Sequence, residues 1–161
     1  MTFDAIIEIP RGSRNKYEMD HETGLIRFDR VLFSPMFYPA DYGFVPDTLG
    51  LDGDPLDVLV FLTEPTFPGC IIEVKPIGVL NMSDDKGQDE KILCVPVADP
   101  TWNQLENIND MNPHTLKAVE HFFKTYKDLE NKTCEVNGYG DKAQALEIIQ
   151  AAYDRYVPEA H

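Results

Sequence analysis

Three aspartates fall within six residues, at the start of an apolar segment that predicts a buried strand. They are Asp52, Asp54 and Asp57. Gly53 allows the backbone between them to turn and Pro55 stiffens it, so the carboxylates project from a constrained loop. Like charges at the end of a buried strand are unfavourable unless cations neutralise them, and several carboxylate oxygens together suit Mg2+, Mn2+ or Ca2+. The folded chain therefore needs positive charge next to these carboxylates, at the start of the predicted strand.

The net charge of the chain limits the kinds of molecule that it can bind. Its 161 residues include 14 Lys plus Arg and 28 Asp plus Glu, which gives a formal net charge of -14. An acidic protein repels nucleic acid and anionic membranes, so we expect neither as a partner. No run approaches the ~18 apolar residues of a membrane span, and the first residues lack the pattern of a signal peptide. We therefore expect a single domain over residues 1–161, located in the cytoplasm.

The spacing of apolar residues predicts strands in the first two thirds of the chain and helices in the last third. The expected strands are 2–10, 16–19, 25–32, 56–62, 70–80 and 92–97, with a short one at 134–136. Residues 34–50 are rich in proline and aromatic side chains, and we expect a long irregular segment there. Five or six antiparallel strands and two helices predict an α+β, mainly β domain, built as a small closed barrel with flanking helices.

Capping residues and apolar spacing define the two helices. Asn112 followed by Pro113 predicts the start of the first helix, and Asp141 predicts the start of the second. The side chains expected to be buried are Leu116, Val119, Phe122, Phe123, Tyr126 and Leu129 in the first helix, and Leu146, Ile149, Tyr153 and Tyr156 in the second. In the first strand, alternation places Glu8 on the face opposite the apolar side chains.

A second acidic turn lies at another strand junction, where it could face the first. It contains Asp84, Asp85 and Asp89. Acidic loops are often only solvated, but two such clusters around one site would form a cage for cations. An EF-hand loop is excluded by its spacing: counted from Asp52, the position that requires glycine is Asp57 and the final glutamate position is Thr63.

The histidines and cysteines do not indicate a zinc site. The four histidines, at positions 21, 114, 121 and 161, form no H-E-x-x-H motif and have no cysteine at metal-binding spacing. We expect His114 and His121 to lie on a helix surface or at a subunit contact. Three widely spaced cysteines, Cys70, Cys94 and Cys134, predict reduced core thiols rather than a disulfide framework.

Basic and phenolic side chains supply the opposite charge. Lys16, Arg30, Lys91 and Lys127 come from four separated segments, and Tyr126 adjoins the last of them. A single exposed lysine is usually only a solubilising charge. Beside carboxylate-bound cations, however, Lys, Arg and Tyr donors are what a small polyanion such as a phosphate compound requires. The sequence contains no Walker loop and no nucleophile elbow, so neither a glycine cradle for a nucleotide nor a covalent mechanism is predicted.

The acidic loop and its neighbours resemble the family I soluble inorganic pyrophosphatases of the bacterial type. Residues 52–57 match the family signature of Asp, a small or polar residue, Asp, Pro or Glu, any residue, and Asp. Further blocks resemble the family in the same order along the chain; they are 7–10, 16–18, 29–30, 37–43, 76–82 and 121–130. The resemblance therefore extends over nearly the whole chain.

The resemblance implies a five-stranded OB-like barrel with flanking α-helices, and Mg2+-dependent hydrolysis of pyrophosphate to two phosphates, with Mn2+ or Zn2+ as substitutes. The implied metal ligands are Asp52, Asp57, Asp89, Asp84 and Glu8. The implied phosphate ligands are Lys16, Arg30, Tyr42, Tyr126, Lys127 and Lys91. Supporting positions are implied for Glu18, Tyr38 and Asp85, the last of which stands where many members have Glu.

In the implied mechanism, metal cations lower the pKa of a water that attacks one phosphorus atom in line. Asp54 occupies the position of the usual general base. Asp89 is the alternative proton acceptor, because carboxylates that share metals titrate together. The bacterial branch is usually hexameric, so the resemblance also implies a homohexamer.

Two other classes of protein stay open when only the residues are considered. A non-catalytic cation-binding protein would explain the acidic clusters but leaves Lys16, Arg30 and Tyr42 without a role. An OB-type nucleic-acid module would use the loop aromatics as stacking platforms, but the net charge of -14 argues against it.

Overall fold

β-Strands fill most of the first two thirds of the chain, as the alternating pattern predicts. The computed structural model describes residues 1–158, and His161 lies outside the described part. The strands are β1 (Phe3–Ile9), β2 (Asn15–Asp20), β3 (Leu25–Val31), β4 (Asp41–Phe44), β5 (Asp57–Val60), β6 (Ile71–Asp84), β7 (Gly87–Gln88), β8 (Lys91–Pro96) and β9 (Glu135–Gly140). The helices are α1 (Pro113–Thr125) and α2 (Lys142–Arg155), with short 3-10 turns η1 (Ile108–Asp110) and η2 (Asp128–Glu130).

Five strands close into a ring of hydrogen bonds. Their order is β1-β4-β5-β8-β6, and β6 pairs again with β1, which confirms the expected closed barrel. One pairing corrects the expectation of an antiparallel barrel, because β5 and β8 run parallel. Both faces of these two strands are buried, as is usual for parallel strands. The parallel register places Asp57 directly opposite Lys91.

The segment 34–50, expected to be irregular, contains strand β4. This short strand lies between β1 and β5 in the ring. Gly43 pairs with Ile7 on one side and with Val58 on the other. The prediction missed the strand because it is four residues long and lies between Pro39 and Pro46, which read as loop signals.

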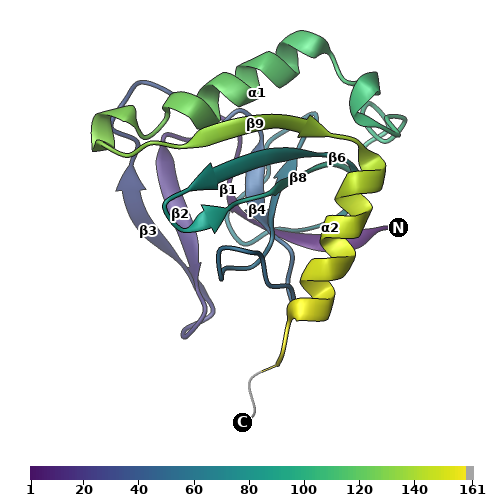
Figure 1. Cartoon of the computed structure of the whole chain (residues 1–161), viewed down its shortest axis with the longest axis horizontal. Helices are drawn as coiled ribbons and strands as arrows, with labels where there is room; N and C mark the ends of the chain where they lie inside the picture. The colour runs from purple at the N-terminus through teal and green to yellow at the C-terminus, as the bar shows by residue number, and fades with distance from the viewer. Residues whose placement is uncertain (159–161) are drawn as a thin grey trace.

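Strands β2 and β3 form a separate two-stranded sheet. Figure 1 shows this hairpin standing to one side of the barrel, away from α2. Lys16 and Arg30 are paired residues within it. Lys16 and Glu18 share a face of the hairpin, as predicted, and their charged groups lie 3.6 Å apart. The hairpin therefore carries two of the predicted phosphate ligands on an element that is not part of the ring.

The two helices cover different groups of buried side chains, and Figure 1 shows them on different sides of the barrel. Val119, Phe122 and Phe123 of α1 pack with one group, which includes Leu59 and Leu93. The other group, which includes Val58 and Ile92, packs against α2 through its buried residues Ala145, Ile149 and Ala152. Neighbouring residues of β5 and β8 thus enter opposite groups, as the two-residue period of a strand requires.

The predicted helix starts are confirmed, and parts of the predicted apolar faces are wrong. The Asn112 side chain accepts from the His114 N–H, and the Asp141 side chain accepts from the Gln144 N–H. Leu129 is 65% exposed, because the chain has left α1 and entered η2 at that point. Tyr156 lies beyond the end of α2 and is also exposed.

The three cysteines are free, with Cys94 buried in the core and Cys70 and Cys134 only half-buried. The reduced state is therefore as expected, but only Cys94 is a fully buried core thiol. Among the described residues, no helix is both long enough and apolar enough to cross a membrane.

Gly43 is essential for the closure of the barrel. A Cβ atom at this position would lie 1.9 Å from the backbone carbonyl oxygen of Ile6, which cannot move without disrupting the pairing of β1 with β4. We expect Gly43→Ala to lower the free energy of unfolding by about 3 kcal/mol or more, measured by urea denaturation. Gly24→Ala is the control, because Gly24 has positive φ but no atom within 4 Å of the added carbon; its loss should be about 1 kcal/mol. Equal losses in the two variants would contradict the steric explanation.

Candidate active site

The predicted site residues meet in one cavity of about 500 Å³ at the end of the barrel where β5 and β8 begin. Its lining includes Glu8, Lys16, Glu18, Arg30, Tyr42, Asp52, Asp54, Asp57, Asp84, Asp85, Asp89, Lys91, Tyr126 and Lys127. Of the predicted residues, Tyr38 alone is absent from the lining. It is almost completely buried, and its ring lies 5.6 Å from that of Tyr42 and 6.4 Å from that of Tyr126. Tyr38 therefore packs behind two tyrosines that do face the cavity.

The acidic loop has the constrained backbone that its glycine predicts. Gly53 has a φ of 89°, in the left-handed region that glycine adopts without strain. The Asp54 N–H donates to an Asp52 carboxylate oxygen over 3.1 Å, and the Gly50 N–H donates to the Asp54 carbonyl over 2.7 Å. Asp52 is thereby held by its own loop.

The end of α2 anchors the segment that leads into this loop. The Leu49 N–H donates to the carbonyl of Ala152 over 3.0 Å, and the Arg155 guanidinium donates to the carbonyl of Leu49. The N–H and the carbonyl of Leu49 are thus both hydrogen-bonded to the last turn of α2.

Three carboxylates converge in the cavity. One oxygen each from Asp52, Asp57 and Asp89 lies within 4.8 Å of the other two. The three residues come from the acidic loop, from the start of β5 and from the turn before β8. Hard oxygen donors that approach from separate elements fit a divalent cation such as Mg2+ or Mn2+. The two acidic segments therefore do face each other, and Asp52, Asp57 and Asp89 are the residues that could hold the ion.

Lys91 lies between two of these acids. Its ammonium group is 3.0 Å from Asp57, 3.1 Å from Asp89 and 3.0 Å from the Tyr42 hydroxyl. Only 2% of its side chain is exposed. Because β4, β5 and β8 are neighbours in the ring, the fold itself brings the side chains of Tyr42, Asp57 and Lys91 together.

Burial and the lysine charge act in opposite directions on the acids. Burial raises the pKa of Asp57 well above its ordinary value, against the lowering effect of Lys91. Burial also acts to raise the pKa of Asp89, but Lys91 and the hydrogen bond with Asp57 outweigh it, and that pKa lies below its ordinary value. Burial acts to lower the pKa of Lys91, and the two carboxylates together with Tyr42 reverse this and raise it well above its ordinary value. The three groups form one coupled set, in which Lys91 stays charged.

The remaining predicted acids line the cavity outside the three-carboxylate cluster. Burial raises the pKa of Glu8, whose carboxylate accepts from the Met19 N–H over 2.7 Å. Asp84 accepts from the Lys86 N–H over 2.9 Å and is the last residue of β6, just before the turn to β7. Asp54 is more open, with 64% of its side chain exposed, and its nearest cation is Lys86 at 3.9 Å. An exposed carboxylate at the mouth of the cavity is free to accept a proton from a water molecule.

Basic groups from several elements line the same cavity. The Lys16 ammonium lies 3.2 Å from Asp29, and the Arg30 guanidinium contacts Asp29 and lies 2.8 Å from Glu130. Tyr126 and Lys127 follow α1 directly and reach the cavity from a third direction. Cations from the hairpin, from β8 and from the end of α1 thus surround the acids.

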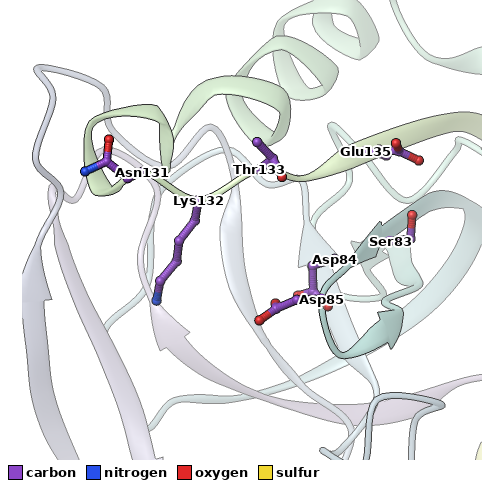
Figure 2. Close-up of a pocket in the computed structure, with 7 residues that line it drawn as sticks. All are labelled: Ser83, Asp84, Asp85, Asn131, Lys132, Thr133 and Glu135. Atoms are coloured by element: carbon purple, nitrogen blue, oxygen red, sulfur yellow. The ribbon is translucent and has the colours of Figure 1, made fainter.

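A second cavity, of about 510 Å³, adjoins the first. It shares Asp84, Asp85 and Lys132 with the main cavity and extends toward Asn131 and Glu135. Figure 2 shows Asp84 and Asp85 at the β6–β7 turn and the Lys132 side chain reaching down from the loop between η2 and β9. This cavity lacks Asp52, Asp57 and Lys91, so we place the candidate active site in the first.

Several residues of the site were not predicted. Lys86 and Lys132 line the main cavity, and Glu130 pairs with Arg30 behind it. Lys86 lies inside the acidic turn, where a lysine looks like a solubilising charge. Glu130 lay within a block that resembles the family, but no spacing in the sequence links it to Arg30.

Comparison with known proteins agrees with the geometry of the site. A family model described as inorganic pyrophosphatase matches residues 5–157. The chain is 59% identical over 154 residues to an inorganic pyrophosphatase of Methanosarcina mazei, covering 96% of this chain and 91% of that protein. It is 54% identical over 160 residues to one of Leifsonia xyli, covering 99% and 98%. The crystal structure of inorganic pyrophosphatase from Thermus thermophilus superposes with a TM-score of 0.94 at 44% identity, covering 96% of this chain and 91% of that one.

The role of Lys91 predicts a specific pH dependence. In Lys91→Met, Asp57 and Asp89 stay buried without their cation, so the pKa of Asp57, already raised by burial, rises further, and the pKa of Asp89 changes from below to above its unfolded value. When the pKa of a carboxyl is higher in the folded than in the unfolded state, the group stabilises the folded protein at pH values below its unfolded pKa, near 4. This stabilisation is lost as pH rises through the folded pKa. With EDTA present, we expect the variant to lose stability as pH rises above about 4, reaching ~3 kcal/mol below the parent protein by chemical denaturation.

Lys86→Met provides the control for this experiment, because the Lys86 side chain is 65% exposed. Its effect should stay within about 0.5 kcal/mol at every pH. A loss in Lys91→Met that does not change with pH would show that Asp57 and Asp89 do not depend on the lysine charge.

Proposed function

Because the chain belongs to the inorganic pyrophosphatase family, of the family I bacterial type that its motifs predict, we propose that it hydrolyses inorganic pyrophosphate to two molecules of orthophosphate. The observation that carries the proposal is the meeting, in one cavity, of three converging carboxylates with lysine, arginine and tyrosine donors from separate elements. Carboxylates alone would serve a cation, and basic groups alone would serve an anion. Both together suit a phosphate compound that binds with divalent cations.

The metal side of the proposed site consists of Asp52, Asp57 and Asp89, with Asp84 and Glu8 as further ligands nearby. Mg2+ is the proposed ion, with Mn2+ or Zn2+ as substitutes. When bound, the cations would neutralise phosphate oxygens and lower the pKa of a water molecule. Asp85 and Glu18 line the same cavity, where they would support the metal-binding residues through water-mediated hydrogen bonds.

The phosphate side consists of Lys16 and Arg30 on the hairpin, Lys91 on β8, and Tyr42, Tyr126 and Lys127. Arg30 presents a planar fork that matches two phosphate oxygens, whereas the lysines act as single charges. These groups would hold the substrate in place and stabilise charge on the leaving phosphate. Tyr38 would keep Tyr42 and Tyr126 in position from behind.

Asp54 is the proposed general base. It stands at the mouth of the cavity, and its side chain is not held in the Lys91 ion pairs. It would take the proton from the attacking water, which then approaches phosphorus in line with the leaving group. Asp89 is the alternative acceptor, although its ion pair with Lys91 keeps its pKa low and makes it the weaker base.

Three wider properties belong to the same proposal. They are a single domain over the whole chain, a homohexamer, and a cytoplasmic location. The family model supports the first by matching residues 5–157 without interruption.

The decisive assay is phosphate release from pyrophosphate. We expect release in the presence of Mg2+, its loss to background when EDTA removes the ion, and its recovery when Mg2+ is restored. Calorimetric titration of the protein with Mg2+ alone should show binding that is weakened in Asp57→Asn. Metal binding without any Mg2+-dependent phosphate release would instead identify a non-catalytic cation-binding protein.

Asp54→Asn tests the general base. Because a positioned base contributes roughly 100-fold or more, we expect kcat to fall by at least that factor at neutral pH. Asp154→Asn, at an exposed position of α2, is the matched control and should retain the parent rate. Turnover of Asp54→Asn close to the parent value would remove Asp54 from this role and leave it to Asp89.

A further inference from the structure

Glu130 is a buried carboxylate for which neither the family signature nor the metal cluster provides a role. It ends η2, and only 6% of its side chain is exposed. One of its oxygens lies 2.8 Å from Nε of Arg30, and the other is buried without a hydrogen-bond partner among the described residues. A buried charge of this kind is unfavourable unless the contact that it makes is required.

The contact joins two parts of the protein that share no sheet. Arg30 lies on the β2–β3 hairpin, whereas Glu130 lies on the segment that follows α1. That segment is a tight turn: the N–H groups of Glu130 and Lys132 both donate to the carbonyl of Lys127, over 3.0 and 3.3 Å. The turn that presents Lys127 to the cavity is therefore the same turn that fixes Glu130.

The geometry around Arg30 shows what the pair accomplishes. The guanidinium is flanked by Asp29 at one terminal nitrogen and by Glu130 at Nε. Glu130 thus acts on the guanidinium at close range, and, against the lowering effect of burial, its charge contributes to the raised pKa of Arg30. With one carboxylate at Nη1 and another at Nε, the remaining N–H groups of the fork are available to a ligand in the cavity that Arg30 lines.

We propose that Glu130 is a positioning residue, which holds the Arg30 guanidinium in place for the substrate phosphate and keeps the hairpin in register with the metal-bearing barrel. The proposal rests on the proposed function of the cavity. Glu130 itself does not line that cavity, so it acts through Arg30 and not on the substrate.

Glu130→Gln tests the proposal, because it keeps the shape of the side chain and removes its charge. Losing the partner of a charged group should raise KM for Mg2+-pyrophosphate about tenfold, while kcat stays within about twofold. The same variant should bind methylenediphosphonate, a diphosphate analogue with a carbon bridge, about tenfold more weakly in calorimetry with Mg2+. Glu120→Gln is the matched control, because Glu120 pairs with Lys124 on the exposed face of α1; it should change neither quantity.

A double-mutant cycle separates positioning from general structural support. In an Arg30→Lys background, Glu130→Gln should have little further effect on KM or on diphosphonate affinity. The reason is that the guanidinium which Glu130 positions is no longer present. Equal effects in both backgrounds, or an unchanged KM in the single variant, would overturn the proposal. A parent protein that binds the diphosphonate but releases no phosphate would refute the proposed function alone, since the binding arm still tests Glu130.

Discussion

The buried ammonium of Lys91 is the interaction on which the rest of the site depends. Asp57 and Asp89 are drawn into a poorly solvated space by the fold, where two like charges repel each other strongly. Lys91 lies within hydrogen-bond distance of both and is itself nearly inaccessible to water. The charge of Lys91 therefore offsets part of the repulsion within the acidic cluster.

The acidic groups and most of the basic groups of the cavity come from different parts of the fold. The carboxylates belong to the ring of strands and to the loops between them, where the parallel register of β5 and β8 leaves little freedom. The basic groups that line the cavity come mainly from elements attached to the ring, namely the hairpin and the turn after α1. Apart from Lys91 on β8, the positive charge of the cavity is thus brought to the ring of strands by tertiary contacts, whereas the negative charge is part of the ring and its loops.

The sequence predicts the barrel and the residues that gather in its cavity, but it misses two details of the strands. Carboxylates clustered in short loops and basic residues within recognisable blocks are local features, and their meeting in one cavity is as expected. Strand β4 was missed because its four residues lie between prolines, and the parallel pairing of β5 with β8 was missed because apolar spacing carries no information on strand direction. The pairing of Glu130 with Arg30 could not be predicted, because only the tertiary fold brings the two residues together.

The attachment of Leu49 to the last turn of α2 has a consequence for how the acidic loop keeps its shape. Ends of helices open more readily than their centres, and here one end holds both the N–H and the carbonyl of Leu49. When that turn frays, the backbone just ahead of Asp52 loses two anchors at once. The order of the acidic loop in the first third of the chain is therefore coupled to the last turn of a helix at the other end of the sequence.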